Sequence, residues 1–244
     1  ILVFRQINRK VIFLSFSYAT LNASKIPKTG GMHMKDENKL VITIGRQFGS
    51  GGCEVGTKLA QELGLDFYDK NILRMNSDES GIEESFYYLA DEKTGNKLLY
   101  KIIKSLTPEK SAPSFGSDLI SADNLFRFQS EVIRKLAAEE NCIIMGRCAD
   151  YVLEGMEGLV RIFIYADMDF REKRTIEKEY YAAKDAKKNI KRIDRERRDY
   201  FRYYTGKEWE SPDNYDLMIN TAAVGINGAV ETIKNYLKTR GFQI

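Results

Sequence analysis

Short apolar runs rich in β-branched residues recur along the chain, and most are followed by a stretch whose apolar positions repeat at helical spacing. The runs predict buried strands, and the helical spacing predicts amphipathic helices. Strands that alternate with helices predict an α/β fold, in which helices cover both faces of a parallel sheet. The predicted strands cover residues 40–44, 65–68, 141–147, 159–166 and 214–222, and the predicted helices cover residues 53–63, 119–140, 167–181, 189–209 and 225–241.

Two segments interrupt this alternation and set the expected domain organisation. Residues 1–33 combine a basic start with a short apolar patch, which resembles a secretory signal but is too short to span a bilayer. We favour a disordered leader or upstream extension here, followed by one domain over residues 34–244. Residues 77–118 hold helical patches and proline-containing turns, and we interpret them as an insertion that forms a substrate-binding lobe.

The first strand and helix are joined by a glycine-rich turn. Gly45, Gly49, Gly51 and Gly52 all fall between them. Backbone N–H groups that converge at such a turn, together with the helix N-terminus, form an anion site suited to phosphate. A tight turn without a ligand is the alternative, and the order strand, turn, helix favours phosphate.

Composition and charge narrow the classes of chemistry. The chain is 43% hydrophobic and 30% charged, as in an ordinary globular protein, and a net charge of +3 is too small to indicate a nucleic-acid polymer. The charge is uneven, because residues 171–207 hold 14 Lys and Arg against 7 Asp and Glu, so an anion is expected there. Three cysteines without zinc-ligand spacing and a single histidine argue against zinc and His-based triads, and they suggest a reducing compartment.

Polar side chains follow the predicted strands, at the edge where open α/β sheets bind ligands. Asp69 follows the second strand, where capping the next helix is the alternative role. Arg147 follows the third strand and is suited to hold an anion through two hydrogen bonds, with a surface ion pair as the alternative. Arg192, Arg195 and Arg198 recur at three-residue spacing on a later helix, which fits either a solvated face or a lid that grips phosphate.

In this order the stretches resemble the cytidylate-kinase-like P-loop proteins, relatives of the bacterial CMP kinases in the nucleoside monophosphate kinase group. The resemblance implies a three-layer P-loop kinase fold with a five-stranded parallel sheet, an acceptor-side insertion and a helical lid over residues 183–209. It implies transfer of the γ-phosphoryl group of ATP to a nucleoside monophosphate, most simply CMP or dCMP, with Mg²⁺ bridging the phosphates. The matching stretches are ITIGRQFGSGGCEVG (42–56), FYDK (67–70), IIMGRCADYVL (143–153), RIFIYADMDFREKR (161–174), IDRERRDYFRYYTGKEW (193–209) and YDLMINT (215–221).

The resemblance also implies roles for residues in the loop, after the strands and in the lid. The loop would cradle the ATP phosphates, the arginine after the third strand would hold the phosphate of the acceptor, and lid arginines would close over the transferred group. The residues implied are Gly49, Ser50, Gly51 and Gly52 in the cradle, Arg147 and Asp69 at the acceptor, and Arg195 and Arg198 in the lid, with Arg192 as a weaker third.

The glycine loop departs from the family's pattern where positive charge is usual. Superposing GSG-K-x-[ST] puts Gly52 at the position of the phosphate-binding lysine and Glu54 at the hydroxyl position. Cys53 replaces the arginine usual in this subgroup, and we favour a small buried thiol there over a reactive thiolate at a helix N-terminus. Arg46, Lys58 and the lid arginines are the candidates to supply the missing charge.

These departures leave three functions open. The first is a cytoplasmic kinase that uses ATP and Mg²⁺ on CMP or dCMP. The second is a non-catalytic nucleotide-binding or regulatory module on the same fold, and the third is a kinase for another small acceptor. We expect nucleotides as partners, with no nucleic-acid polymer and no membrane.

Overall fold

The structure, a computed structural model, describes residues 39–69, 98, 101–102, 105 and 122–244. The predicted extension over residues 1–33 and nearly all of the predicted insertion over residues 77–118 lie outside the described residues. In the described part, no helix is both long and apolar enough to cross a bilayer.

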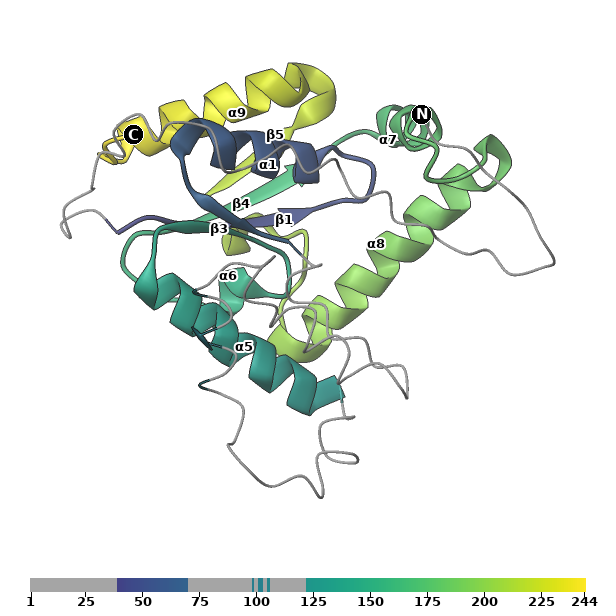
Figure 1. The fold of residues 1–244 in the computed structure, drawn as a ribbon. Helices are drawn as coiled ribbons and strands as arrows, with labels where there is room; N and C mark the ends of the chain where they lie inside the picture. The colour runs from purple at the N-terminus through teal and green to yellow at the C-terminus, as the bar shows by residue number, and fades with distance from the viewer. Residues whose placement is uncertain (1–38, 70–97, 99–100, 103–104, 106–121) are drawn as a thin grey trace. The chain divides into compact units, whose positions relative to one another are not determined.

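Five parallel strands form one sheet in the described part of the chain, in the order β2–β3–β1–β4–β5 (Figure 1). β1 lies at the centre, with Val41 opposite Cys142 of β3 and opposite Leu159 of β4. Because every pairing is parallel, the carboxyl ends of the strands meet at one edge, where such sheets bind ligands. The strands are β1 (Val41–Arg46), β2 (Asp66–Tyr68), β3 (Cys142–Met145), β4 (Leu159–Tyr165) and β5 (Leu217–Asn220).

Helices cover both faces of this sheet, which confirms the three-layer α/β fold (Figure 1). On one face α1 and α9 bury Leu59 and Ile233 against Ile44 of β1. On the other face α5 buries Ile133 against Ile144 of β3. The helices are α1 (Gly52–Leu63), α5 (Ala122–Glu139), α6 (Ala149–Val152), α7 (Met168–Glu177), α8 (Ala183–Thr205) and α9 (Thr221–Thr239), with a 3₁₀ turn η1 (Pro212–Asn214).

The long helix α8 runs from beside α7 to the end of α5 (Figure 1). Its C-terminal half is anchored by aromatic contacts: Phe201 joins a buried cluster with Phe163 of β4, and Tyr204 stacks on Phe126 of α5 at 4.0 Å. The helix ends at Gly206, whose left-handed backbone lets its N–H bond back to Arg202. The predicted lid segment is therefore a packed helix in this structure.

Three elements of the structure differ from those expected. The helix expected over residues 189–209 is α8, which begins six residues earlier, at Ala183, and ends at Thr205. Thr221, expected within the last strand, instead begins a first turn that is joined to α9, and the Asn220 side chain caps this turn by accepting from the Ala222 N–H at 2.9 Å. Gly225 breaks the helical backbone within α9, with φ 70° and ψ 176°, and sequence periodicity resumes only after this break. The short helix α6 after β3 was not predicted, because one turn is too short to show a period.

Candidate active site

The glycine loop joins β1 to α1 at the carboxyl edge of the sheet. Gly49 and Gly51 have φ values of 78° and 82°, a backbone region that favours glycine. Gly51 caps α1 without any side-chain hydrogen bond. The first-turn N–H groups of α1 are therefore left to a ligand, and the helix dipole makes an anion the favoured one.

Ser50 shapes the loop from inside and is fully buried. Its hydroxyl donates to the Gln47 carbonyl at 2.8 Å, and its own carbonyl accepts from the Thr221 hydroxyl at 2.6 Å. The Ser50 hydroxyl is thus committed to the loop, and its backbone carbonyl is committed to the start of α9. Its contribution to a phosphate cradle would come from the backbone.

Side chains from neighbouring elements hold the loop in place. The Gln47 amide accepts from the Ala166 N–H at 3.1 Å and donates to Glu210 at 2.9 Å. Asp194 of α8 accepts from the Phe48 N–H at 2.8 Å and pairs with Arg171 of α7. Both members of this ion pair are buried, so the loop, α7 and α8 are joined through one charged contact.

Three arginines surround the loop on the side of β3. Arg46 ends β1, and its guanidinium lies 3.9 Å from the Asp69 carboxylate. Arg197 of α8 donates to the Arg46 carbonyl at 2.8 Å and lies 5.7 Å from the Phe48 ring centroid. Arg147 lies 6.0 Å from the ring centroid of Tyr200.

Burial makes this concentration of positive charge costly. Burial, and to a smaller extent the charge of Arg147, lowers the pKa of Arg46, although Asp69 opposes the change. Burial and the neighbouring Arg46 lower the pKa of Arg197 to about 9. A bound anion would relieve both effects, because an opposite charge favours the charged form of a base.

The turn after β3 aims Arg147 at the site through an unusual backbone. Gly146, Arg147 and Cys148 have φ values of 73°, 56° and 54°, so three successive residues are left-handed. For a residue other than glycine this conformation costs about 1–3 kcal/mol, and such strain is concentrated at functional sites. The guanidinium of Arg46 fills the space that a side chain at Gly146 would need.

Glu54 places a negative charge in the first turn of α1, and two cations at the end of α7 pair with it. Glu54 lies 2.9 Å from Arg174 and 2.9 Å from Lys178, and these two partners hold its pKa below the ordinary value against the effect of burial. Lys58 donates to Asn227 at 2.6 Å, so its ammonium is held at α9. The Cys53 side chain is exposed, and its sulfur lies 3.8 Å from Asp69, so the expectation of a buried thiol was wrong.

A family model describes residues 41–223, most of the chain, as the cytidylate kinase-like family. The chain belongs to the cytidylate kinase-like family. No curated protein matches the sequence. An uncharacterized protein from Eubacterium ventriosum is similar in structure, with 26% identity, a TM-score of 0.61, and coverage of 82% of this chain and 99% of that chain. Family membership supports phosphoryl transfer with nucleotide use as the general class of chemistry.

Two shikimate kinases are more distant matches. The enzyme from Bacteroides thetaiotaomicron has 12% identity and a TM-score of 0.46, with 82% of this chain and 98% of that chain covered. The enzyme from Acinetobacter baumannii, in complex with shikimate, has 13% identity and a TM-score of 0.44, with 85% and 97% covered. Neither likeness bears on the substrate of this chain.

In this member of the cytidylate kinase-like family, the structure gathers some predicted residues and separates others. The loop glycines, Arg46, Asp69 and Arg147 lie together at the carboxyl edge. Arg195 is exposed, Arg192 is exposed and pairs with Glu196 at 2.6 Å, and Arg198 pairs with Glu210 at 3.0 Å. Arg198 is linked to the loop through Glu210, which also accepts from the Gln47 side chain at 2.9 Å, whereas Arg192 and Arg195 lie on the exposed face of α8.

Sequence reasoning missed the α8 residues that approach the loop, Asp194 and Arg197. A helix turns by about 100° per residue, so these neighbours of Arg195 point to a different side. A usable signal was present, because Asp194 lies four and eight residues after the buried Ile190 and Ala186. That spacing puts Asp194 on the buried face rather than on the charged one.

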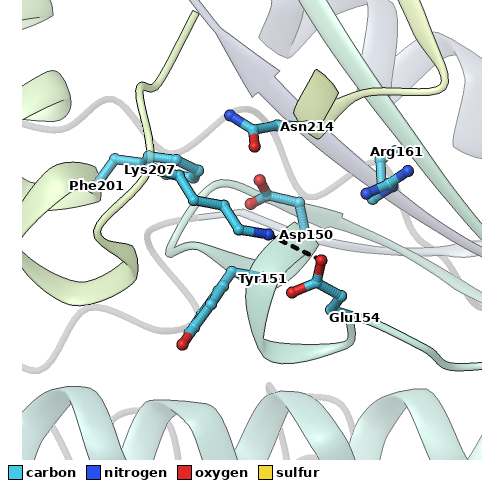
Figure 2. Close-up of a pocket in the computed structure, with 7 residues that line it drawn as sticks. All are labelled: Asp150, Tyr151, Glu154, Arg161, Phe201, Lys207 and Asn214. Atoms are coloured by element: carbon cyan, nitrogen blue, oxygen red, sulfur yellow. Dashed lines mark hydrogen bonds and ion pairs between the residues drawn. The ribbon is translucent and has the colours of Figure 1, made fainter. Parts of the chain in front are cut away.

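A shallow hollow lies beside α6, and none of the arginines near the loop lines it (Figure 2). Lys207 and Glu154 pair across it at 2.8 Å, as the dashed line in Figure 2 shows. Burial raises the pKa of Asp150 in this hollow to about 6. Both cations of the hollow are already paired, because Arg161 binds Asp216, outside the lining, at 2.9 Å. Its lining residues are Asp150, Tyr151, Glu154, Arg161, Phe201, Lys207 and Asn214.

The groups around the glycine loop fit the phosphates of ATP better than they fit a directly bound metal ion. Left-handed glycines, an uncapped helix start and buried arginines fit the phosphates of a nucleotide. In the described part, no group of three His, Cys, Asp or Glu side chains could hold a metal ion. Mg²⁺ often keeps several waters and is held by substrate phosphates with one or two carboxylates. Asp69 is the carboxylate placed to approach such an ion.

Proposed function

We propose that this protein transfers the γ-phosphoryl group of ATP to a nucleoside monophosphate, with CMP or dCMP as the first acceptors to test. The observation that carries the proposal is the surplus of positive charge beside the glycine loop. In the described part, five arginines lie around the loop with three carboxylates, and two of these carboxylates, Asp194 and Glu54, are already paired with Arg171 and Arg174. The other three arginines are Arg46, Arg147 and Arg197, and the third carboxylate is Asp69. Two anionic reactants would supply the missing negative charge.

The residues divide between the two reactants by position. The loop and the first turn of α1 would bind the ATP phosphates through backbone N–H groups. Arg46 and Arg197, next to the loop, would stabilise charge on the transferred group. Arg147, at the end of β3, would hold the phosphate of the acceptor through its planar fork of donors.

The protein has little covalent work to do in this reaction. Phosphoryl transfer depends on in-line positioning and on stabilisation of charge over the phosphoryl oxygens. Mg²⁺, which would arrive with ATP, supplies further charge neutralisation when bound. Closure of α8 would bring Arg192, Arg195 and Arg198 nearer and exclude water, which otherwise competes as acceptor.

A nucleotide-binding module without turnover is the second candidate. Gly52 stands where the phosphate-binding lysine is usual, and Glu54 is held by Arg174 and Lys178 rather than left to a metal ion. The buried arginines favour the kinase, because a transition state with spread charge needs more cations than binding alone. We further propose a cytoplasmic location and nucleotides as the partners.

The test is ADP release from Mg·ATP by the full chain, with CMP, dCMP, UMP, AMP or no acceptor. Acceptor-dependent turnover that is lost in Arg147→Ala supports the kinase. Arg134→Ala is the matched control, because Arg134 pairs with Glu131 on the exposed face of α5. ATP binding without turnover on any of these acceptors would refute this proposal and favour the binding module.

A further inference from the structure

Gly52 is a glycine because of space rather than backbone conformation. It is the first residue of α1, and its φ lies outside the left-handed region that Gly49 and Gly51 occupy. A Cβ built on Gly52 would lie 2.6 Å from the Cβ of Arg46 and 3.1 Å from its Cγ. Real Cβ atoms essentially never come within 3.0 Å of another atom, so position 52 admits no side chain while Arg46 is present.

Arg46 is enclosed by a second glycine as well. Its guanidinium occupies the space of a Cβ at Gly146, at the end of β3. The side chain therefore passes from Gly52 to Gly146, across the carboxyl edge of the sheet. Positions 46, 52 and 146 therefore depend on one another, because both glycines make room for the same arginine.

Positions 46 and 52 correspond to two fixed positions of the P-loop pattern. The pattern G-x-x-x-x-G-K-[ST] begins with glycine and has lysine six positions later. With Gly51 as the second glycine, the first glycine falls at Arg46 and the lysine at Gly52. This chain thus has a cation where the pattern has glycine, and glycine where the pattern has the cation.

We propose that Arg46 and Gly52 are an exchanged pair, in which Arg46 supplies from the end of β1 the phosphate-binding charge that lysine supplies from α1. The inference rests on the proposed use of a nucleotide at the loop. The stem of Arg46 lies in the space that the stem of a lysine at position 52 would enter. Its charged end is buried near Asp69, and burial is the main cause that lowers its pKa.

A stability cycle tests the shared space. Gly52→Ala should lower the thermal midpoint in the wild-type chain and should be tolerated in an Arg46→Gly background, since the clashing atoms are then gone. Gly56→Ala is the matched control on the same helix, because its Cβ would meet Phe67 at 2.7 Å and should destabilise both backgrounds alike. An equal loss for Gly52→Ala in both backgrounds would overturn the exchange.

A binding cycle tests the role of the charge. Mg·ADP and Mg·ATP affinity, measured by calorimetry, should fall about 10- to 100-fold in Arg46→Gly, as expected for one charge-assisted hydrogen-bonding group. The double variant Arg46→Gly/Gly52→Lys should recover most of that loss. If it binds no better than Arg46→Gly while keeping its circular dichroism spectrum, the role of Arg46 is overturned.

The two cycles separate this inference from the proposed function. A wild-type chain that binds nucleotide but turns over no acceptor refutes the kinase, and the recovery of affinity in the double variant still decides the exchange. A wild-type chain that binds no nucleotide overturns both the kinase and the phosphate-binding role of Arg46.

Discussion

The buried ion pair between Arg171 and Asp194 should be the strongest single connection between the loop and the two helices beside it. The side chains are 7% and 9% exposed, and Asp194 also accepts from the Phe48 N–H at 2.8 Å. Asp194→Ala would leave a buried guanidinium and a loop N–H without this acceptor. Removing one partner of a buried pair costs about 3–5 kcal/mol.

This loss of stability can be converted into an expected shift of the thermal midpoint. For a chain of this length, about 1 kcal/mol corresponds to roughly 2–4 °C, so Asp194→Ala should lower the midpoint by roughly 6–20 °C. Asp194→Asn should lose less, because its amide oxygen still accepts from Phe48. The double variant Arg171→Met/Asp194→Leu should be more stable than Asp194→Ala, since no charge is then left buried alone.

Urea denaturation at pH 7 gives the free energies of unfolding for this cycle. Glu196→Ala is the matched control, because it breaks the exposed pair with Arg192 on the same helix and should leave the midpoint unchanged. The reasoning is refuted if the losses in Arg171→Met and Asp194→Leu simply add in the double variant. A loss below about 1 kcal/mol in Asp194→Ala would refute it equally, because an exposed pair costs that little.

Three further predictions concern Arg147, Arg197 and Asp150. Arg147→Gly should be more stable to urea than Arg147→Ala by about 1 kcal/mol, because only glycine relieves the left-handed backbone, and equal stability would contradict the strain. Arg197→Met should weaken Mg·ATP binding about tenfold or more without lowering the midpoint of the ligand-free protein; unchanged affinity in calorimetry would exclude a phosphate contact. Burial raises the pKa of Asp150 to about 6 in the folded protein, so the folded state keeps this proton up to a higher pH than the unfolded chain does. The contribution of Asp150 to the free energy of unfolding is therefore full below about pH 4 and is lost as the pH rises through about 6. Asp150→Asn should therefore gain about 3 kcal/mol over wild type at pH 7 and little at pH 4, and a constant difference in urea denaturation would contradict this.

The sheet could be predicted because its strands are buried on both faces. Runs such as residues 159–166 are apolar except for Arg161, and the alternation with helices leaves a parallel sheet as the simple solution. Element ends were less predictable, because they depend on single contacts. The start of α9 depends on the cap that Asn220 provides, and this cap lies outside any hydrophobic period.

The residues of the site could be predicted only where their position in the sequence, relative to a strand, determines where they lie in the fold. Gly49 and Gly51 lie in the turn after β1 and Arg147 lies in the turn after β3, so their place at the carboxyl edge follows from topology. Arg197 was missed because the three-residue spacing of Arg192, Arg195 and Arg198 favoured another face of the same helix as the phosphate-binding one. The dependence between Arg46 and Gly52 needed coordinates, since five residues of turn separate the two positions whose atoms would collide.

The measurement that tests the central claim most directly is ADP release from Mg·ATP with and without CMP, for the full chain and for Arg147→Ala. The proposed kinase predicts fast release that depends on an acceptor, is lost in Arg147→Ala and is retained in Arg134→Ala. Release that is equal with and without every nucleoside monophosphate, from a chain that binds ATP, would contradict it.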